Sequence, residues 1–150
     1  MTSTLKLVSH GIAPPLPGGR IAIAPLPLLR ETNPFPVGDR HDPISFPYPY
    51  VNQDVLTIVA PEGYVVDGVP GPVERSSAIG RYTLTAEKGA GEKVVVQRTF
   101  SIARANSGPE AYEAYRSLFE AAVRADAALS IVFRKAAPAP ASASAARPAP

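Results

Sequence analysis

Hydrophobic residues recur at every second position through the middle of the chain. Residues 80–87 alternate cleanly between apolar and polar side chains, and residues 92–103 repeat the pattern, with Arg98 interrupting the apolar face. Alternation of this kind is typical of strands that bury one face, as the strands of antiparallel sheets do. The glycines within residues 88–91 favour a hairpin between the two strands, because glycine readily adopts positive φ.

Further segments are predicted to be strands from their apolar and β-branched residues: 4–9, 20–24, 54–60, 64–68 and 130–135. Residues 54–60 are mostly apolar and β-branched at consecutive positions, which is typical of a buried strand. Between two of these strands, Pro61, Glu62 and Gly63 predict a type I turn, with proline at position i+1 and glycine at position i+3.

The apolar residues switch once to a three-to-four-residue rhythm, and this predicts a helix over residues 109–128. Ser107 is expected to cap the helix, with Glu110 completing a capping box. The fold is therefore predicted to be mainly β. It is an antiparallel β-sandwich of about six to eight strands, with this C-terminal amphipathic helix packed on it and a last strand after the helix. The apolar stripe of the helix consists of Tyr112, Tyr115, Leu118, Phe119, Ala122 and Val123.

Proline and small residues divide the chain into regions. Ten of the 18 prolines lie between residues 14 and 49, where they exclude long helices and central strands. Residues 1–37 are therefore expected to be a proline-rich extended region with one or two edge strands that belong to the sandwich, and residues 38–135 to be its core. Residues 136–150 contain only Ala, Pro, Ser and Arg, so we predict a disordered tail.

The charge of the chain does not predict nucleic-acid binding, although its pI is 9.0. Arg134, Lys135 and Arg147 belong to the end of the chain, which leaves 12 basic against 13 acidic residues in positions 1–133. Phosphate binding requires a concentrated positive field, and the sequence contains no basic block that would provide one. We therefore expect no nucleic-acid partner.

The chain has no cysteine, which removes thiolate metal sites and cysteine nucleophiles. His10 and His41 lack an acidic cluster at ligand spacing, so we expect neither a metal nor another cofactor. No apolar run approaches the roughly 20 residues of a transmembrane helix. A complete chain with this N-terminus is expected to be cytoplasmic, whereas a piece of a longer secreted protein would be periplasmic or extracellular.

Residues 39–42 (Asp-Arg-His-Asp) form the densest polar cluster. One interpretation makes His41 a general base aligned by a carboxylate, as in a small hydrolase. The other, which we favour, is a solvated loop in which Asp42 begins a turn and Arg40 pairs with a nearby acid to fix the loop on the sheet.

Arg98 interrupts the apolar face of its predicted strand, between Val96 and Phe100. A buried arginine needs a carboxylate or carbonyl partner, and Glu62 or Asp67 is a candidate. A β-bulge that turns Arg98 outward is the alternative.

Phe46, Tyr48 and Tyr50 are spaced by two, so they would share one face of an extended segment. If exposed, they could form an aromatic platform for a sugar or a proline-rich peptide. If buried, they would cover one edge of the sandwich core. We favour burial, because aromatic side chains contribute most when they are packed.

Several short motifs follow one another between residues 38 and 135: Arg40-x-x-Pro43-Ile44, Pro47-Tyr48, Pro61-Glu62-Gly63-Tyr64-x-Val66, Val69-Pro70, Val94 to Phe100, Tyr112-x-x-Tyr115-x-x-Leu118-Phe119 and Ile131-Val132-Phe133-x-Lys135. In this order they resemble the C-terminal β-sandwich domain of large bacterial transglutaminase-like proteins. In that family a β domain comes first, a papain-like transglutaminase domain second, and the non-catalytic β domain that this chain resembles last.

The resemblance implies a non-catalytic accessory domain, whose protein partner is the transglutaminase-like domain in cis or in trans. It would pack on that domain or present substrate to it. The family's chemistry is not implied for this chain, because it needs a Cys, a His and an Asp, and the chain has no cysteine. The alternative is a carbohydrate- or peptide-binding module of the cell envelope that uses Phe46, Tyr48 and Tyr50.

Overall fold

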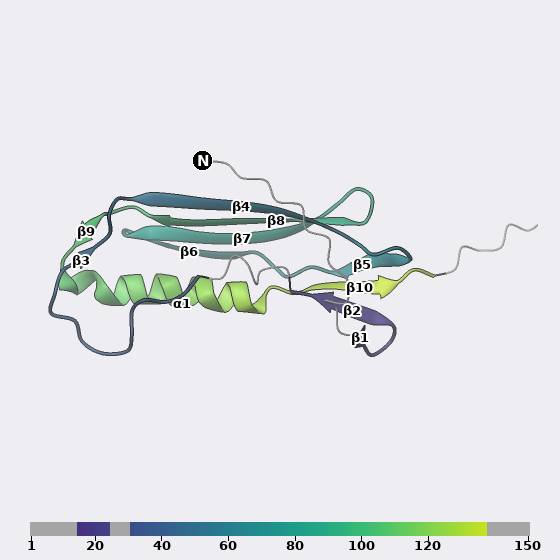
Figure 1. Cartoon of the computed structure of the whole chain (residues 1–150), viewed down its shortest axis with the longest axis horizontal. Coiled ribbons are helices and arrows are strands. Elements are labelled where there is room, and N and C mark those ends of the chain that lie inside the picture. Colours follow the sequence, from purple (N-terminus) through teal and green to yellow (C-terminus); the bar gives the residue numbers. More distant parts are fainter. Residues whose placement is uncertain (1–14, 25–30, 138–150) are drawn as a thin grey trace, which may run out of the picture.

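The computed structural model describes residues 15–24 and 31–137, which form antiparallel sheets and a helix near the C-terminal end (Figure 1). The main sheet has the order β4-β8-β7-β6, with β4 (Tyr50–Val59), β8 (Lys93–Ile102), β7 (Gly80–Gly89) and β6 (Val73–Ser77). The second sheet has the order β1-β2-β10-β5, with β1 (Pro15–Leu16), β2 (Arg20–Ile23), β10 (Ile131–Lys135) and β5 (Tyr64–Gly68). A short pair joins β3 (Ile44–Ser45) and β9 (Asn106–Ser107).

The main sheet forms one layer, and helix α1 (Tyr112–Ala128) lies along one of its faces, with the second sheet beyond the end of the helix (Figure 1). We call the face toward α1 the inner face. The hydrophobic core lies between these layers and includes Tyr82, Phe100, Leu118 and Phe133. The predicted fold class is confirmed, because the described strands pair antiparallel and the helix is followed by the last strand, β10.

The alternation seen in the sequence makes the main sheet one-sided. In β8, Val94, Val96 and Phe100 are fully buried, while Lys93 and Gln97 are exposed. β7 and β8 pair over the whole of both strands, so the predicted hairpin is confirmed. The two-residue period of buried and exposed side chains was therefore sufficient to predict β7 and β8.

α1 begins at Tyr112, after a 3-10 turn at Pro109–Ala111, and no side chain caps either element. The predicted capping box is wrong. Ser107 lies in β9, and its hydroxyl is 3.0 Å from the hydroxyl of Tyr115 instead. Pro109 has no N–H to satisfy, which reduces the need for a cap at this end. The predicted apolar stripe is buried except for Val123, which is half-buried.

β4 is not the buried strand that its consecutive apolar residues predicted. Leu56 and Ile58 pack against the core, but Val51, Val55 and Val59 are 62%, 70% and 56% exposed. The reason is that these valines point away from the core, and that β4 has only β8 beside it in the main sheet. Its outward side chains are uncovered by the described part of the chain.

The turn before β5 also differs from the prediction. The N–H of Tyr64 donates to the carbonyl of Pro61 at 3.0 Å, which makes Pro61 position i and Gly63 position i+2. Gly63 has a φ of 77°, as a type II turn requires at i+2. The predicted type I turn, with glycine at i+3, is therefore wrong by one register position.

The proline-rich segment before residue 38 contributes to the core. Phe35 is 6% exposed, and its ring centroid lies 5.3 Å from that of Phe119 and 5.7 Å from that of Tyr115. Asn33 fixes this segment along α1, because its amide donates to a helix carbonyl at 3.4 Å while its amide oxygen accepts the N–H of Phe35 at 3.0 Å. The helix is thus packed from two sides.

Three predictions fall outside the described residues: the strand at 4–9, the environment of His10, and the tail from residue 138 onward. In the ranges 15–24 and 31–137, no helix is both long enough and apolar enough to cross a lipid bilayer. β6, β1, β3 and β9 were not predicted, because they are short and mostly exposed and therefore lack a hydrophobic period.

The two faces of the main sheet can be compared with matched substitutions. Val96→Ala removes two methyl groups from a fully buried site and should lower the free energy of unfolding by about 2 kcal/mol. Val55→Ala changes an outward side chain and should cost less than about 1 kcal/mol. Urea unfolding followed by circular dichroism measures both. Equal losses would contradict the assignment of the two faces.

Candidate functional site

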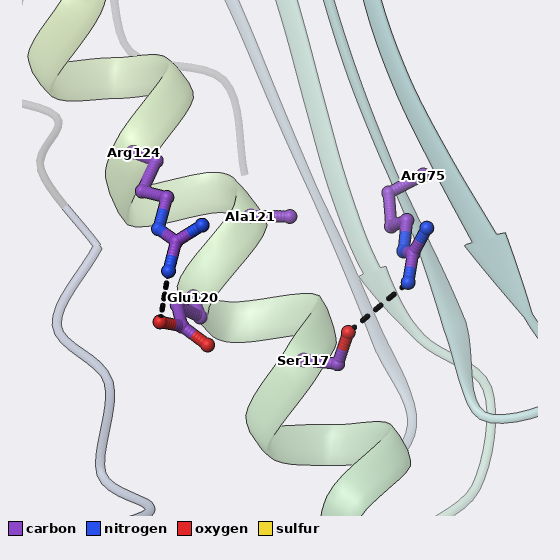
Figure 2. A pocket seen from close by; sticks show the side chains of 5 residues that line it. All are labelled: Arg75, Ser117, Glu120, Ala121 and Arg124. Carbon is purple, nitrogen blue, oxygen red and sulfur yellow. Dashed lines mark hydrogen bonds and ion pairs between the residues drawn. The ribbon is translucent and has the colours of Figure 1, made fainter.

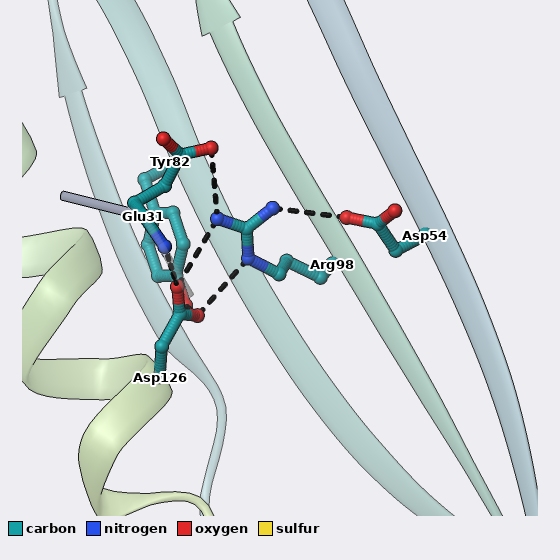
Figure 3. Close-up of polar contacts among 5 residues, drawn as sticks. All are labelled: Glu31, Asp54, Tyr82, Arg98 and Asp126. Atoms are coloured by element: carbon teal, nitrogen blue, oxygen red, sulfur yellow. Dashed lines mark hydrogen bonds and ion pairs between the residues drawn. The ribbon is translucent and has the colours of Figure 1, made fainter. Parts of the chain in front are cut away.

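A buried arginine lies between the main sheet and the helix (Figure 3). Arg98 is on β8, and its side chain is 2% exposed because strand alternation turns it inward with its neighbours of the same parity. Asp126 on α1 faces it and accepts two hydrogen bonds, from Nε at 3.0 Å and from Nη2 at 3.1 Å. A bidentate pair of this kind is among the strongest contacts between a guanidinium and a carboxylate.

Three further side chains surround this pair (Figure 3). Nη1 of Arg98 donates to Asp54 of β4 at 2.9 Å, and Nη2 donates to Glu31 at 3.2 Å. The hydroxyl of Tyr82, on β7, donates to Asp126 at 2.7 Å. We call Arg98, Asp126, Asp54, Glu31 and Tyr82 the arginine cluster. In the described part of the chain, no buried side-chain nitrogen or oxygen lacks a hydrogen-bond partner.

The pKa values of the cluster follow from burial and from its carboxylates. Burial alone would lower the pKa of Arg98, but its contacts with Asp126, Asp54 and Glu31 raise that pKa above the ordinary value. Burial also raises the pKa of Tyr82, and the hydrogen bond to Asp126 raises it further, because an ionised phenol would face a carboxylate. Arg98 therefore stays charged and Tyr82 stays protonated at neutral pH.

The arginine cluster connects segments that are far apart in the sequence. It joins β8 to α1 across 28 residues and to the segment at Glu31 across 67 residues. The three carboxylates are arranged around a guanidinium, and within the described residues no group of His, Asp or Glu is placed to hold a metal ion. The chemistry of the cluster is that of fixed, paired charges.

The prediction that Glu62 or Asp67 pairs with Arg98 is wrong, and so is the alternative of a β-bulge. Asp67 pairs with Arg20 at 3.0 Å and with Arg134 at 3.4 Å in the second sheet. The register of β8 with both neighbouring strands runs past position 98 without interruption.

Asp126 is the partner that sequence reasoning missed. It extends the buried stripe of Tyr115, Phe119 and Ala122 by one more helical step, so a carboxylate stood at a core-facing position of the helix. A charged residue on the apolar face of a strand and another on the apolar face of a helix were together the signal for a buried ion pair.

Arg40 fixes the loop before β3, but through groups other than those predicted. Its guanidinium donates to the carbonyls of Asp42 at 3.0 Å and Pro43 at 3.2 Å, and lies 5.9 Å from the ring centroid of Tyr112. The predicted acidic partner is wrong, since no carboxylate of the described residues pairs with Arg40. Asp42 takes part through its backbone, and His41 is exposed beside it.

Two of the shallow hollows on the described surface are lined by residues outside the arginine cluster. One, of about 370 Å³, lies between the loop at His41 and the start of α1. The other, of about 310 Å³, lies between β6 and α1 (Figure 2). There Arg75 donates to Ser117 at 3.2 Å and Arg124 pairs with Glu120, so both cations have partners. Neither of these two hollows reaches the buried charges of the arginine cluster.

Phe46, Tyr48 and Tyr50 do not share one face, contrary to the prediction. Phe46 and Tyr50 are half-buried against the core, with ring centroids 6.2 Å apart, whereas Tyr48 is 66% exposed. The alternation fails because β3 ends at Ser45 and β4 begins only at Tyr50, so Tyr48 belongs to neither strand. A platform of three coplanar rings is therefore not formed.

The face of the main sheet that points away from α1, the outer face, is uncovered by the described residues (Figure 1). The strand registers place its uncharged side chains in the middle, around Val55, Gln97 and Thr85, which lie side by side across three strands. Its charged residues stand nearer the ends and the β6 edge. The outward residues are Val51, Gln53, Val55, Thr57 and Val59 of β4, Lys93, Val95, Gln97, Thr99 and Ser101 of β8, Arg81, Thr83, Thr85 and Glu87 of β7, and Glu74 and Ser76 of β6.

These features define a class of protein: an antiparallel β domain in which one helix and a smaller sheet cover one face of a four-stranded sheet. Residues 19–133 match the profile of a family described as a domain of unknown function with a solved structure (DUF3858). Because the match covers most of the chain, the chain belongs to this family.

The fold is similar to part of a crystal structure from Parabacteroides distasonis ATCC 8503, of a protein described as a "putative protease". The TM-score is 0.53 at 20% sequence identity, and the similarity covers 63% of this chain. The chain spans 18% of the length of that protein. At this identity the likeness shows the fold alone. No curated protein matches the sequence.

Removal of Asp126 tests the arginine cluster. Asp126→Ala leaves Arg98 buried without its bidentate partner and should lower the free energy of unfolding by about 3–5 kcal/mol. Glu74→Ala removes one partner of the exposed Arg81–Glu74 pair and should cost less than about 1 kcal/mol. Urea unfolding compares the two. A small loss for Asp126→Ala would show that the cluster does not hold α1 on the sheet.

The raised pKa of Tyr82 predicts a loss of stability at high pH. The folded-state pKa lies above the unfolded value of 10.0, so this contribution is complete below pH 10 and is lost as the pH rises further. Unfolding free energies at pH 9 and pH 11, taken as ~1 unit on either side of that value, should differ less in Tyr82→Phe than in the parent. Tyr48→Phe, at an exposed site, should keep the parent's pH dependence. An unchanged difference in Tyr82→Phe would refute the assignment.

Proposed function

We propose that this chain is a non-catalytic accessory domain of a bacterial transglutaminase-like protein, and that it binds the enzymatic domain of that protein through its outer face. The observation that carries the proposal is the uncovered outer face of the main sheet. The family supports it as well, because the chain belongs to a family of domains and has the fold of a segment that makes up 18% of a longer bacterial protein.

The outer face has the anatomy of a protein-binding surface. Its middle carries Val, Thr and Gln side chains, and its charged residues stand toward the rim. Interfaces generally deplete charge in their centre and keep it at the edge. A flat face of β-branched residues also suits packing against another sheet, as in the sandwiches that two antiparallel sheets form. A folded domain is therefore a better partner for this face than a small molecule.

The same proposal assigns catalysis to the partner. Transglutaminase chemistry of the papain type needs a cysteine nucleophile, and this chain has none. Arg98 and Asp126 carry the most strongly buried charges, and these two charges pair with each other. Neither residue lines one of the two hollows described above. These residues hold the fold in place while the reaction proceeds elsewhere.

The carbohydrate- or peptide-binding role has less support. Aromatic platforms for sugars need several exposed rings in one plane. Of Phe46, Tyr48 and Tyr50, only Tyr48 is exposed, and the outer face carries no aromatic residue. We therefore keep the accessory role as the proposed function.

Binding to the enzymatic domain can be measured directly. The chain is titrated by calorimetry against the separately purified transglutaminase-like domain encoded with it in the same genome. We expect a one-to-one complex with a Kd of about 1 μM or tighter, since interfaces between domains resemble transient protein interfaces. Thr85→Arg, in the middle of the outer face, should weaken binding at least about tenfold by burying an unpaired charge.

Ala127→Arg is the matched control. Ala127 is exposed on α1, on the opposite layer of the molecule, so this variant should bind like the parent. Absence of binding by the parent, or equal weakening by both variants, would refute the proposed function.

A further inference from the structure

The main sheet has one open edge of unusual length. β4 pairs with β8 at ten consecutive positions, from Tyr50 opposite Ile102 to Val59 opposite Lys93, without a bulge. On its other side, no described residue forms a hydrogen bond with the backbone of β4. A long, regular edge strand leaves a row of N–H and C=O groups that can pair with another strand.

The other sheet ends are protected. β6, at the opposite end of the main sheet, is five residues long and exposed at each position. It is preceded by Pro70 and Pro72 and charged at Glu74 and Arg75. Its Arg75 also reaches α1 through Ser117 (Figure 2). Short length, nearby prolines and charge are devices by which proteins prevent pairing at an edge.

β5, at one end of the second sheet, is protected by side chains. The carboxylate of Glu92 accepts the N–H of Val66 at 2.7 Å, and the ammonium of Lys88 donates to the Val66 carbonyl at 3.1 Å. These contacts occupy backbone groups that a further strand would need. At the other end of that sheet, β1 is two residues long and begins with Pro15.

β4 carries none of these devices. It contains no proline and one charged residue, Asp54, whose carboxylate is held by Arg98. Its outward side chains present Val51, Val55 and Val59 to solvent. Among the sheet edges that the structure describes, β4 is therefore both the longest and the least protected.

The outward residues of β4 are self-complementary, and this points to the occupant. They read Val51, Gln53, Val55, Thr57 and Val59, with valine at both ends and at the centre. In antiparallel pairing centred on Val55, Val51 lies opposite Val59 of the partner subunit, and Val55 lies opposite Val55 of the partner subunit. A shift of one residue would set outward against inward side chains, and a shift of two would set valine against glutamine or threonine.

We propose that β4 pairs with β4 of a second copy of this chain, so that the two main sheets join into one continuous sheet across a twofold axis. The pairing is isologous and closes on itself, as most homodimer contacts do. α1 packs on β6 and β7, at the far side of the sheet, and leaves the β4 edge free. This inference rests on the backbone edge of β4, whereas the proposed function rests on the outer face, and Val55 belongs to both surfaces.

Light scattering with size-exclusion chromatography tests the dimer. The parent chain should elute at twice its mass of 15.7 kDa, and Val55→Lys should elute at that mass while keeping the parent's circular-dichroism spectrum. Ser76→Lys, at an outward position of the protected β6 edge, is the matched control and should remain dimeric. A monomeric parent, or a dimeric Val55→Lys, would overturn the proposal.

Single cysteines test the register, because the chain has no cysteine of its own. Directly opposite residues have Cβ atoms about 4.5–5.5 Å apart, so Val55→Cys should form a covalent dimer on oxidation. The two copies of Val59→Cys would be separated by roughly 26 Å along the strands and should not cross-link. A mixture of Val51→Cys and Val59→Cys should give only the mixed dimer.

Cross-linking that is equal at all three positions would contradict the register and overturn this pairing. If the parent is monomeric but binds the transglutaminase-like domain, the second copy is refuted while the proposed function stands.

Discussion

The buried contact between Arg98 and Asp126 is the constraint on which the arrangement of this domain depends. Removing a guanidinium and a carboxylate from water is costly, and only a well-aligned, fully hydrogen-bonded pair offsets the cost. The bidentate geometry therefore allows one depth and one rotation of α1 over the main sheet. Asp54 and Glu31 attach β4 and the proline-rich segment to the same guanidinium. The side chain of Arg98 therefore connects four parts of the chain: β8, α1, β4 and the proline-rich segment.

This constraint gives the main sheet two unlike faces. The large aromatic residues gather on the inner side, where the ring of Phe100 lies 4.8 Å from that of Phe119, while the outer face holds β-branched and amide side chains. The inner face is used for folding, because both the apolar core and the buried charges lie there. The outer face and the β4 edge have no structural role within the described residues, which is why function is best sought there.

The sequence predicted the elements that have a clear period. β7, β8 and α1 followed from repeats of two and of three to four residues, since each buries one face. The burial of β4 was predicted wrongly, because a run of apolar residues does not reveal whether both faces of a strand are covered. Val55 is exposed on the outer face of the sheet and lies in an edge strand. The partner of Arg98 was missed because the signal for the ion pair is divided between two segments that are distant in the sequence. Asp126 could be identified only by extending the helical stripe to a charged residue.

The β4 edge and the outer face point in perpendicular directions, so each could bind a partner at the same time. Strand pairing at β4 extends the sheet within its own plane, whereas docking on the outer face approaches along the normal to that plane. A twofold axis perpendicular to the sheet keeps the outer faces of both copies on the same side, so a dimer would present two adjoining docking surfaces. A protein of this kind would hold two enzymatic domains next to one another. On these two proposals, the unprotected edge and the uncharged middle of the outer face would both serve assembly.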